Sequence, residues 1–186
     1  MSILRYLLLA EPFLQLLLLL FSPTSFQPKK AGFKIGVGDL GISATQVKCL
    51  DIKASYDFCK KNNPPFLSQL KKDPIGRDTF YIHDLDGNIW QYLQGNSWYT
   101  QDGHHSGGVI GCSTGVSDMD GAFKLYKEVL GFDEVVYDQT GHFEDWSDLL
   151  HGNGKFRRVL LSQSAQPGGG FAKVTGKTYI ELIQAL

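Results

Sequence analysis

The sequence predicts an α+β fold, in which two paired βαβββ modules form mixed sheets that curl around a central cleft. Two observations lead to this prediction. The chain contains an internal repeat, and within each copy the spacing of apolar residues changes from strand-like alternation to helical steps and back again. A chain of 186 residues is long enough to bury a core of this kind.

The repeat is clearest at the start and at the end of each copy. The stretch CLDIKASY at residues 49–56 matches VSDMDGAF at residues 116–123, with an aspartate, a large aliphatic residue, small residues and an aromatic residue in step. In the same way, NIWQYLQ at residues 88–94 matches TYIELIQ at residues 178–184. Gln91 and Glu181 therefore occupy the same place in the two copies.

Each copy begins with a strand and a helix. We expect strands at residues 45–49 and 109–116, each followed by a helix with one apolar face. Asp51 and Asp118 stand where N-cap carboxylates would accept backbone N–H groups, and Gly131 stands where a C-cap would end the second helix. The expected apolar faces consist of Ile52, Tyr56 and Cys59 in the first helix, and of Ala122, Phe123, Tyr126, Val129 and Leu130 in the second.

Three further strands complete each module. In the first copy we expect them at residues 67–71, 78–83 and 88–94, with a tight DGN hairpin at residues 86–88. In the second copy we expect them at residues 134–137, 156–162 and 178–184, with an insertion that holds His142, Glu144, Trp146 and His151. The predicted boundaries are a first module at 33–95, a linker at 96–107 and a second module at 108–186.

Residues 1–32 form a Leu-rich leader that stands apart from the modules. Its uninterrupted apolar stretch is short for a membrane span, which needs about 20 residues, but suits the core of a signal peptide. The leader is therefore a signal or anchor segment, a non-native start, or a helix packed on the body of the protein. We expect a cytoplasmic protein, or an exported or anchored one if the leader acts as a signal.

Composition narrows the range of partners. The formal net charge is −1 and the lysines and arginines are scattered, so there is no basic stripe to neutralise phosphates and nucleic acid is not expected as a partner. Cys49, Cys59 and Cys112 are odd in number and lack CxxC spacing, which favours free thiols over a disulfide framework or a structural zinc site.

Two stretches resemble the vicinal oxygen chelate (VOC) superfamily, which includes glyoxalase I, extradiol dioxygenases and bleomycin-resistance proteins. DLDGNIWQ at residues 84–91 resembles the hairpin that ends one module of that family, and VSDMDGAFKLYKEVLGF at residues 116–132 resembles the opening of another. The resemblance covers about residues 33–186. In that family the module with the DGN hairpin normally closes a domain, but in this chain it comes first. The two modules therefore pair with each other, pair across a homodimer, or belong to a longer array of which this chain is a fragment.

The resemblance implies where metal ligands would lie. In metal-using members each module offers one ligand from its first strand and one from its last. The last-strand positions fall on Gln91 and Glu181. The resemblance thus implies Glu181 as a metal ligand or catalytic base and Gln91 as a weaker ligand, for a divalent Mn, Zn, Ni, Fe or Mg ion.

The first-strand positions are less favourable. By the family's spacing they fall on Ala44 and Gly111, and neither side chain binds a metal. Gln46 and Cys112 are close, but a shift of one residue turns a side chain to the other face of a strand. Two plausible ligands are too few for a dedicated metal site unless histidines from elsewhere in the fold complete it.

Histidines are the remaining candidate ligands. His142 and Glu144 would lie on one side of an extended segment, although a long loop also places such residues at the surface. Trp90 and Tyr92 alternate with Gln91 and are expected on the opposite face, in the core or at an interface. The histidines to be considered are His83, His104, His105, His142 and His151.

The sequence therefore supports three hypotheses about the function. The first is a metal-dependent lyase, isomerase or dioxygenase that acts on a small molecule in the cleft. The second is a module that binds a small molecule without metal or chemistry, as bleomycin-resistance proteins do. The third is a truncated fragment with an incomplete site. A homodimer or pairing with further modules is expected in any of these cases.

Overall fold

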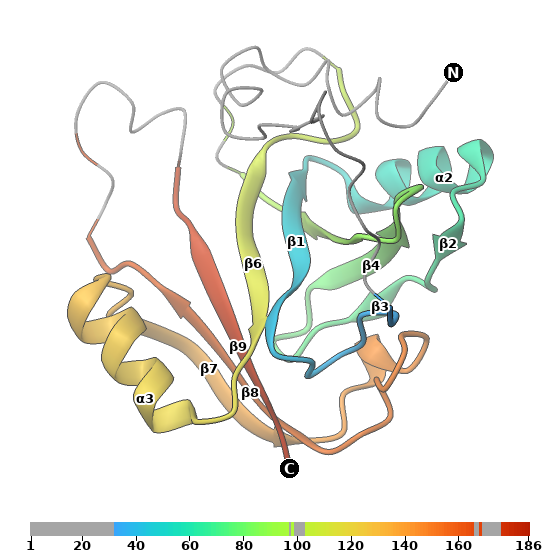
Figure 1. Ribbon diagram of the computed structural model, residues 1–186. Helices are drawn as coiled ribbons and strands as arrows, with labels where there is room; N and C mark the ends of the chain where they lie inside the picture. The colour runs from blue at the N-terminus through green and yellow to red at the C-terminus, as the bar shows by residue number, and fades with distance from the viewer. Residues whose placement is uncertain (1–31, 97, 99–102, 166–167, 169–175) are drawn as a thin grey trace, which may run out of the picture.

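The computed structural model describes residues 32–96, 98, 103–165, 168 and 176–186 (Figure 1). Apart from Gly32, the Leu-rich leader lies outside the described residues, as does part of the predicted linker. Within the described ranges, no helix has both the length and the apolar character that crossing a bilayer requires.

The first copy of the repeat folds as a strand, a helix and a set of antiparallel strands. The segment predicted as a single strand at residues 67–71 is divided into two short strands, and both pair with the following long strand. The elements of this copy are β1 (Gly41–Cys49), α2 (Ile52–Asn62), β2 (Phe66–Leu67), β3 (Lys71–Lys72), β4 (Asp78–His83) and β5 (Ile89–Gln94).

The second copy repeats this order, with the single strand β7 where the first copy has β2 and β3. Its insertion contains a short 3-10 helix, which packs against the inner face of the sheet. The elements are β6 (Val109–Gly115), α3 (Met119–Phe123), the π-helical turn η2 (Lys124–Val129), β7 (Glu134–Gly141), η3 (Glu144–Trp146), β8 (Phe156–Ser162) and β9 (Tyr179–Ala185).

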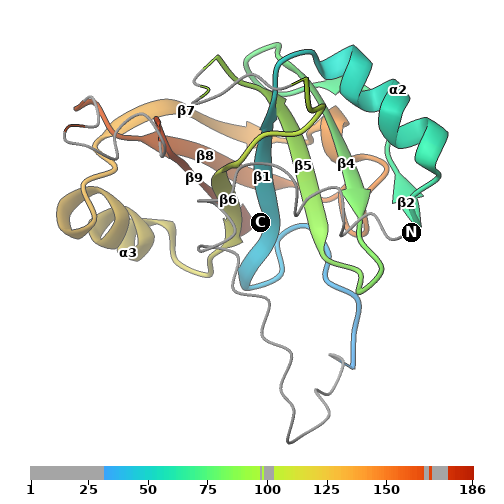
Figure 2. The same ribbon diagram turned by 90° about the horizontal axis from the view of Figure 1, so that it is seen from above.

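The two copies form one open mixed sheet. Its strand order is β2-β4-β5-β1-β6-β9-β8-β7, with β3 paired to β4. In each copy the first and last strands are parallel neighbours, β1 with β5 and β6 with β9. The antiparallel pair β1–β6 joins the copies at a seam, which lies at the middle of the curved sheet in Figure 2. The α+β fold of paired βαβββ units is thus confirmed.

Both predicted caps form, and a third aspartate holds the predicted hairpin. Asp51 accepts hydrogen bonds from the backbone N–H groups of Lys53 (2.9 Å) and Ala54 (3.0 Å), at the start of α2. Asp118 does the same for Asp120 N (3.1 Å) at the start of α3. In the hairpin, Asp84 accepts hydrogen bonds from the backbone N–H groups of Asp86 and Asn88, each at 2.9 Å. The DGN motif therefore forms the turn between β4 and β5.

The second helix differs from its prediction in its last turn. Val129 and Leu130 were expected on the apolar face, but they are 71% and 48% exposed. The cause is the π-helical turn, in which Leu130 N donates to Leu125 O (3.0 Å). Because this wider turn departs from 3.6 residues per turn, residues beyond it no longer continue the buried stripe of α3.

The two faces of the sheet are covered differently. The outer face carries α2 over the first copy and α3 over the second, and Trp90 and Tyr92 lie in the core beneath α2, as predicted. On the inner face a cluster joins both copies with the inserted segment and the chain before β1. Its members are Val37, Ala44, Tyr81, Ile89, Phe143, Trp146, Leu149, Phe156 and Ile183.

Candidate functional site

Four polar side chains form a row across the inner face of the sheet, where the two copies meet. They come one each from β5, β1, β6 and β9, and each is at most 3% exposed. Gln46 on β1 lies in register with Gln91 on β5, and Ser113 on β6 with Glu181 on β9. We call Gln46, Gln91, Ser113 and Glu181 the polar row.

Hydrogen bonds connect the polar row from end to end. Gln46 Nε2 donates to Gln91 Oε1 (3.1 Å) and to Ser113 Oγ (3.4 Å). Ser113 Oγ in turn donates to Glu181 Oε2 (2.6 Å). At the other end, Gln91 Nε2 donates to Thr79 Oγ1 (3.2 Å). The row therefore ends at a carboxylate, which when ionised only accepts hydrogen bonds.

Glu181 also belongs to a buried ionic cluster. Arg158 Nε donates to Glu181 Oε1 (2.7 Å), and Arg158 Nη1 donates to both carboxylate oxygens of Asp145 (2.8 Å each). Tyr137 Oη makes a short hydrogen bond to Glu181 Oε1. Together with Ser113 on Oε2, these donors occupy both oxygens of Glu181. We call Arg158, Glu181 and Asp145 the ionic cluster; none of their side chains is more than 2% exposed.

The surroundings shift the pKa values of the two carboxyls in opposite directions. For Asp145, burial outweighs the attraction of Arg158 and holds the pKa above its ordinary value. For Glu181, burial would also raise the pKa, but the charge of Arg158 and the hydrogen bonds of Ser113, Tyr137 and Arg158 hold it below its ordinary value. Glu181 is therefore an ionised acceptor at neutral pH.

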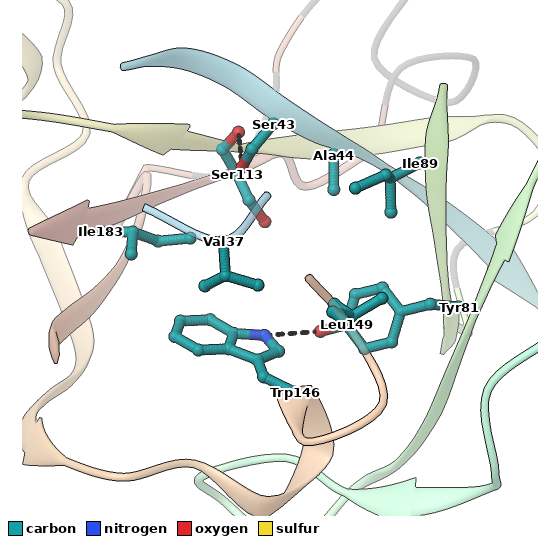
Figure 3. Close-up of a pocket in the computed structure, with 9 residues that line it drawn as sticks. All are labelled: Val37, Ser43, Ala44, Tyr81, Ile89, Ser113, Trp146, Leu149 and Ile183. Carbon is teal, nitrogen blue, oxygen red and sulfur yellow. Dashed lines mark hydrogen bonds between the residues drawn. The ribbon is translucent and has the colours of Figure 1, made fainter. Parts of the chain in front are cut away.

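A small pocket, whose lining is drawn in Figure 3, lies on the same face and shares Ser113 with the polar row. Its volume is about 10 Å³, on the order of the space that one water molecule needs. Ser113 faces both the row and the pocket, and Tyr81 and Ser43 add two more hydroxyl groups. The rest of the wall is apolar, from Val37, Ala44, Ile89, Trp146, Leu149 and Ile183.

The first-strand positions of the site are not those that the family's spacing indicated. Ala44 lines the pocket, and Gly111 lies opposite Gln46, with no side chain of its own. The side chains that join Gln91 and Glu181 are Gln46 and Ser113, each five residues before a capping aspartate. That equal spacing in the two copies was the signal that could have found both.

The residues present do not fit a divalent metal. Both oxygens of Glu181 are held by donors of the chain itself, and one of those donors is a cation. Gln91 is engaged with Gln46 and Thr79. Across the described part of the chain, no group of three or more His, Cys, Asp and Glu residues is arranged to hold a metal ion. Glu181 and Gln91 as metal ligands stay a prediction.

The histidines have other surroundings. The ring of His83 lies tilted against Phe66 with centroids 4.5 Å apart, and His105 stacks on Phe58 at the same distance. His142 Nδ1 lies 3.0 Å from the carbonyl oxygen of Gly154. His104, His151 and Glu144 are exposed. The side chains that do contact Glu181 or its partner are those of Arg158, Asp145 and Tyr137, which the sequence did not single out.

Comparison with family models and with curated proteins finds no match. Among solved structures, glyoxalase I from Zea mays is 15% identical with a TM-score of 0.48, covering 82% of this chain and 45% of that one. The chain thus spans less than half the length of the maize protein. Methylmalonyl-CoA epimerase from Mycobacterium tuberculosis is 11% identical with a TM-score of 0.41, covering 84% of this chain and 93% of that one.

A third structure is a glyoxalase/bleomycin resistance protein/dioxygenase superfamily member from Vibrio splendidus. It is 13% identical with a TM-score of 0.40, covering 77% of this chain and 97% of that one. The fold is consistent with that of the VOC superfamily. The paired βαβββ arrangement of its strands is the one that the resemblance to this superfamily predicted.

Proposed function

We propose that the protein binds a small, neutral and mainly apolar molecule between its two modules, as a VOC-type binding module. The observation that carries this proposal is the lining of the pocket, which combines three hydroxyl-bearing side chains, Ser43, Tyr81 and Ser113, with an apolar wall. Binding sites for small molecules commonly combine apolar walls with a few placed polar groups.

Such a ligand requires the wall of the pocket to move. The pocket has room for roughly one water molecule, because Val37, Trp146 and Leu149 fill the inner face. Two of these residues belong to the inserted segment, and Val37 is tied to it by a hydrogen bond from Val37 N to Leu150 O (2.9 Å). Displacing this wall would open the space above Ser113 and Tyr81.

A pocket-filling substitution tests the proposal. Ala44→Leu places a larger side chain in the pocket, and Ala122→Leu is its control, since Ala122 is similarly buried (9% against 7%) but belongs to α3, in the core of the outer face. We expect phenols and short-chain alcohols to raise the melting temperature of the wild type and of Ala122→Leu, but not of Ala44→Leu. Equal responses of the two variants would count against binding in this pocket.

Metal-dependent lyase, isomerase or dioxygenase activity is tested separately. The test is a calorimetric titration of the wild type and of Glu181→Ala with manganese, zinc and nickel salts, which measures whether either protein binds a metal ion. Because the carboxylate of Glu181 is occupied by Arg158, Ser113 and Tyr137, we expect no stoichiometric binding to the wild type. One-to-one binding that is lost in Glu181→Ala would support the metal-dependent reading instead.

A further inference from the structure

The ionic cluster lies where the polar row meets the inserted segment. Arg158, on β8, contacts Glu181 on β9 through Nε and Asp145 in η3 through Nη1. Its guanidinium also lies over the ring of Trp146, 3.9 Å from the centroid. Trp146 is part of the pocket wall, so a single cation connects the polar row to that wall.

The cluster contains more acidic than basic groups. Two carboxylates share one guanidinium, and the neutral hydroxyl groups of Tyr137 and Tyr81 complete the hydrogen bonding of Glu181 and Asp145. Arg158 is 0% exposed, which is exceptional for arginine and requires that its charge be matched by buried partners. Its donors reach two carboxylates on different elements at once, as a bound metal ion would.

We propose that the guanidinium of Arg158 does the work of a structural cation in this fold, neutralising Glu181 in the polar row and anchoring the pocket wall through Asp145. Without the guanidinium, oxygen atoms of Glu181, Asp145, Tyr137 and Tyr81 would surround the vacated space. Such oxygen ligands suit hard divalent ions such as manganese. The inference does not depend on the proposed ligand, because none of its measurements uses one.

The neighbouring arginine provides a matched control. Arg157 is adjacent in β8 but faces the other way, where it pairs with Asp138 (2.7 Å) with 31% of its side chain exposed. Arg157→Ala removes the same charge and the same number of atoms from the same strand. Any effect specific to the buried cluster must therefore appear in Arg158→Ala and not in Arg157→Ala.

The test measures cation binding to the whole chain. Manganese chloride is titrated into the wild type, Arg157→Ala and Arg158→Ala while free manganese is followed by electron paramagnetic resonance. We expect Arg158→Ala to bind one ion per chain at least about tenfold more tightly than the other two proteins. Low concentrations of guanidinium chloride should raise the melting temperature of Arg158→Ala alone, because the free ion fits the vacated space.

Hydrogen exchange reports on the pocket wall in the same proteins. Amides of residues 143–149 should exchange faster in Arg158→Ala than in Arg157→Ala, and manganese should restore their protection. If Arg158→Ala is unfolded without cations, recovery of its folded circular dichroism spectrum on adding manganese or guanidinium also supports the proposal. No response of Arg158→Ala to either cation would overturn the proposal, as would stoichiometric manganese binding by the wild type that Glu181→Gln abolishes.

Discussion

Glu181 and Asp145 bind the same guanidinium, yet folding affects their protonation in opposite ways. The pKa of Glu181 is lowered in the folded protein, so Glu181 contributes stability above its ordinary pKa and loses it as the pH falls through the folded-state value. The pKa of Asp145 is raised, so its contribution is present below its ordinary pKa and is lost as the pH rises through the folded-state value.

The effects of Glu181→Gln and Asp145→Asn on the free energy of unfolding should therefore diverge as the pH rises. At about pH 7, Glu181→Gln should lower the free energy of unfolding by about 3 kcal/mol, because Arg158 loses its partner in the polar row. Asp145→Asn should lower it by no more than about 1 kcal/mol, because the amide still accepts hydrogen bonds and the penalty of burying a second carboxylate is removed. At about pH 4 the two variants should differ less.

Urea unfolding at both pH values measures this divergence. Asp138→Asn serves as a control, since Asp138 pairs with Arg157 at the surface, where an ion pair contributes no more than about 1 kcal/mol. A larger loss for Asp145→Asn than for Glu181→Gln at neutral pH would contradict the assigned directions of the two pKa shifts.

Single residues of the site were only partly predictable from the sequence. The repeat identified Gln91 and Glu181, because equivalent positions in two copies of one module lie in equivalent places. Arg158 was not identified, since Arg157 and Arg158 are adjacent and point to opposite faces of β8. Which of the two faces inward depends on the register of β8 against β9, and a slip of one residue would exchange them.

Among the elements, β6 shows why a strand at the seam contains glycine. A Cβ atom at Gly111 would lie 2.4 Å from the carbonyl oxygen of Tyr179 and 2.5 Å from Gln46 Oε1. Both distances are shorter than any real contact of such atoms, so the strand would have to shift. Gly111 thus lets the side chain of Gln46 lie flat against β6.

Gly111→Ala should therefore destabilise the protein by about 1–3 kcal/mol, through displacement of Gln46 and of the β6–β9 pair. Gly141→Ala in β7 is the matched control, because no atom beyond the adjacent residues lies within 4 Å of its added Cβ, and its effect should stay within about 0.5 kcal/mol. Thermal or urea unfolding of both variants tests this, and equal midpoints would refute the role assigned to Gly111.

The helices illustrate what patterns along the chain can predict. The caps at Asp51 and Asp118 were predictable because an N-cap depends on residues close in sequence. The π-helical turn after α3 was not, since the apolar spacing of KLYKEV reads equally well as an ordinary helix. The wider turn became visible only through its hydrogen bonds.

At the scale of the whole molecule, the sheet is continuous across the seam between β1 and β6. The sequence predicted two modules but left open whether they pair with each other, across a dimer or with further modules. Pairing within one chain follows from the register of two strands more than sixty residues apart, which no local pattern reveals. A homodimer stays a prediction, for which the mass in solution is the test.

A continuous sheet with a shared polar row should unfold as one unit. We expect far-ultraviolet circular dichroism and tryptophan fluorescence to give coincident urea transitions, because Trp90 reports on the first copy and Trp146 on the inner cluster that joins both. Separate transitions, with one copy persisting after the other has unfolded, would show that the seam contributes little to stability.

The seam also bears on how the chain can be made on the ribosome. While only the first copy has emerged, β1 has β5 on one side and no partner on the other, and the amide of Gln46 faces water. The strand that covers that edge and the serine that bonds Gln46 arrive with β6, and the carboxylate and guanidinium beyond it arrive later still. The inner face can therefore become dry only after β9 has emerged and inserted between β6 and β8.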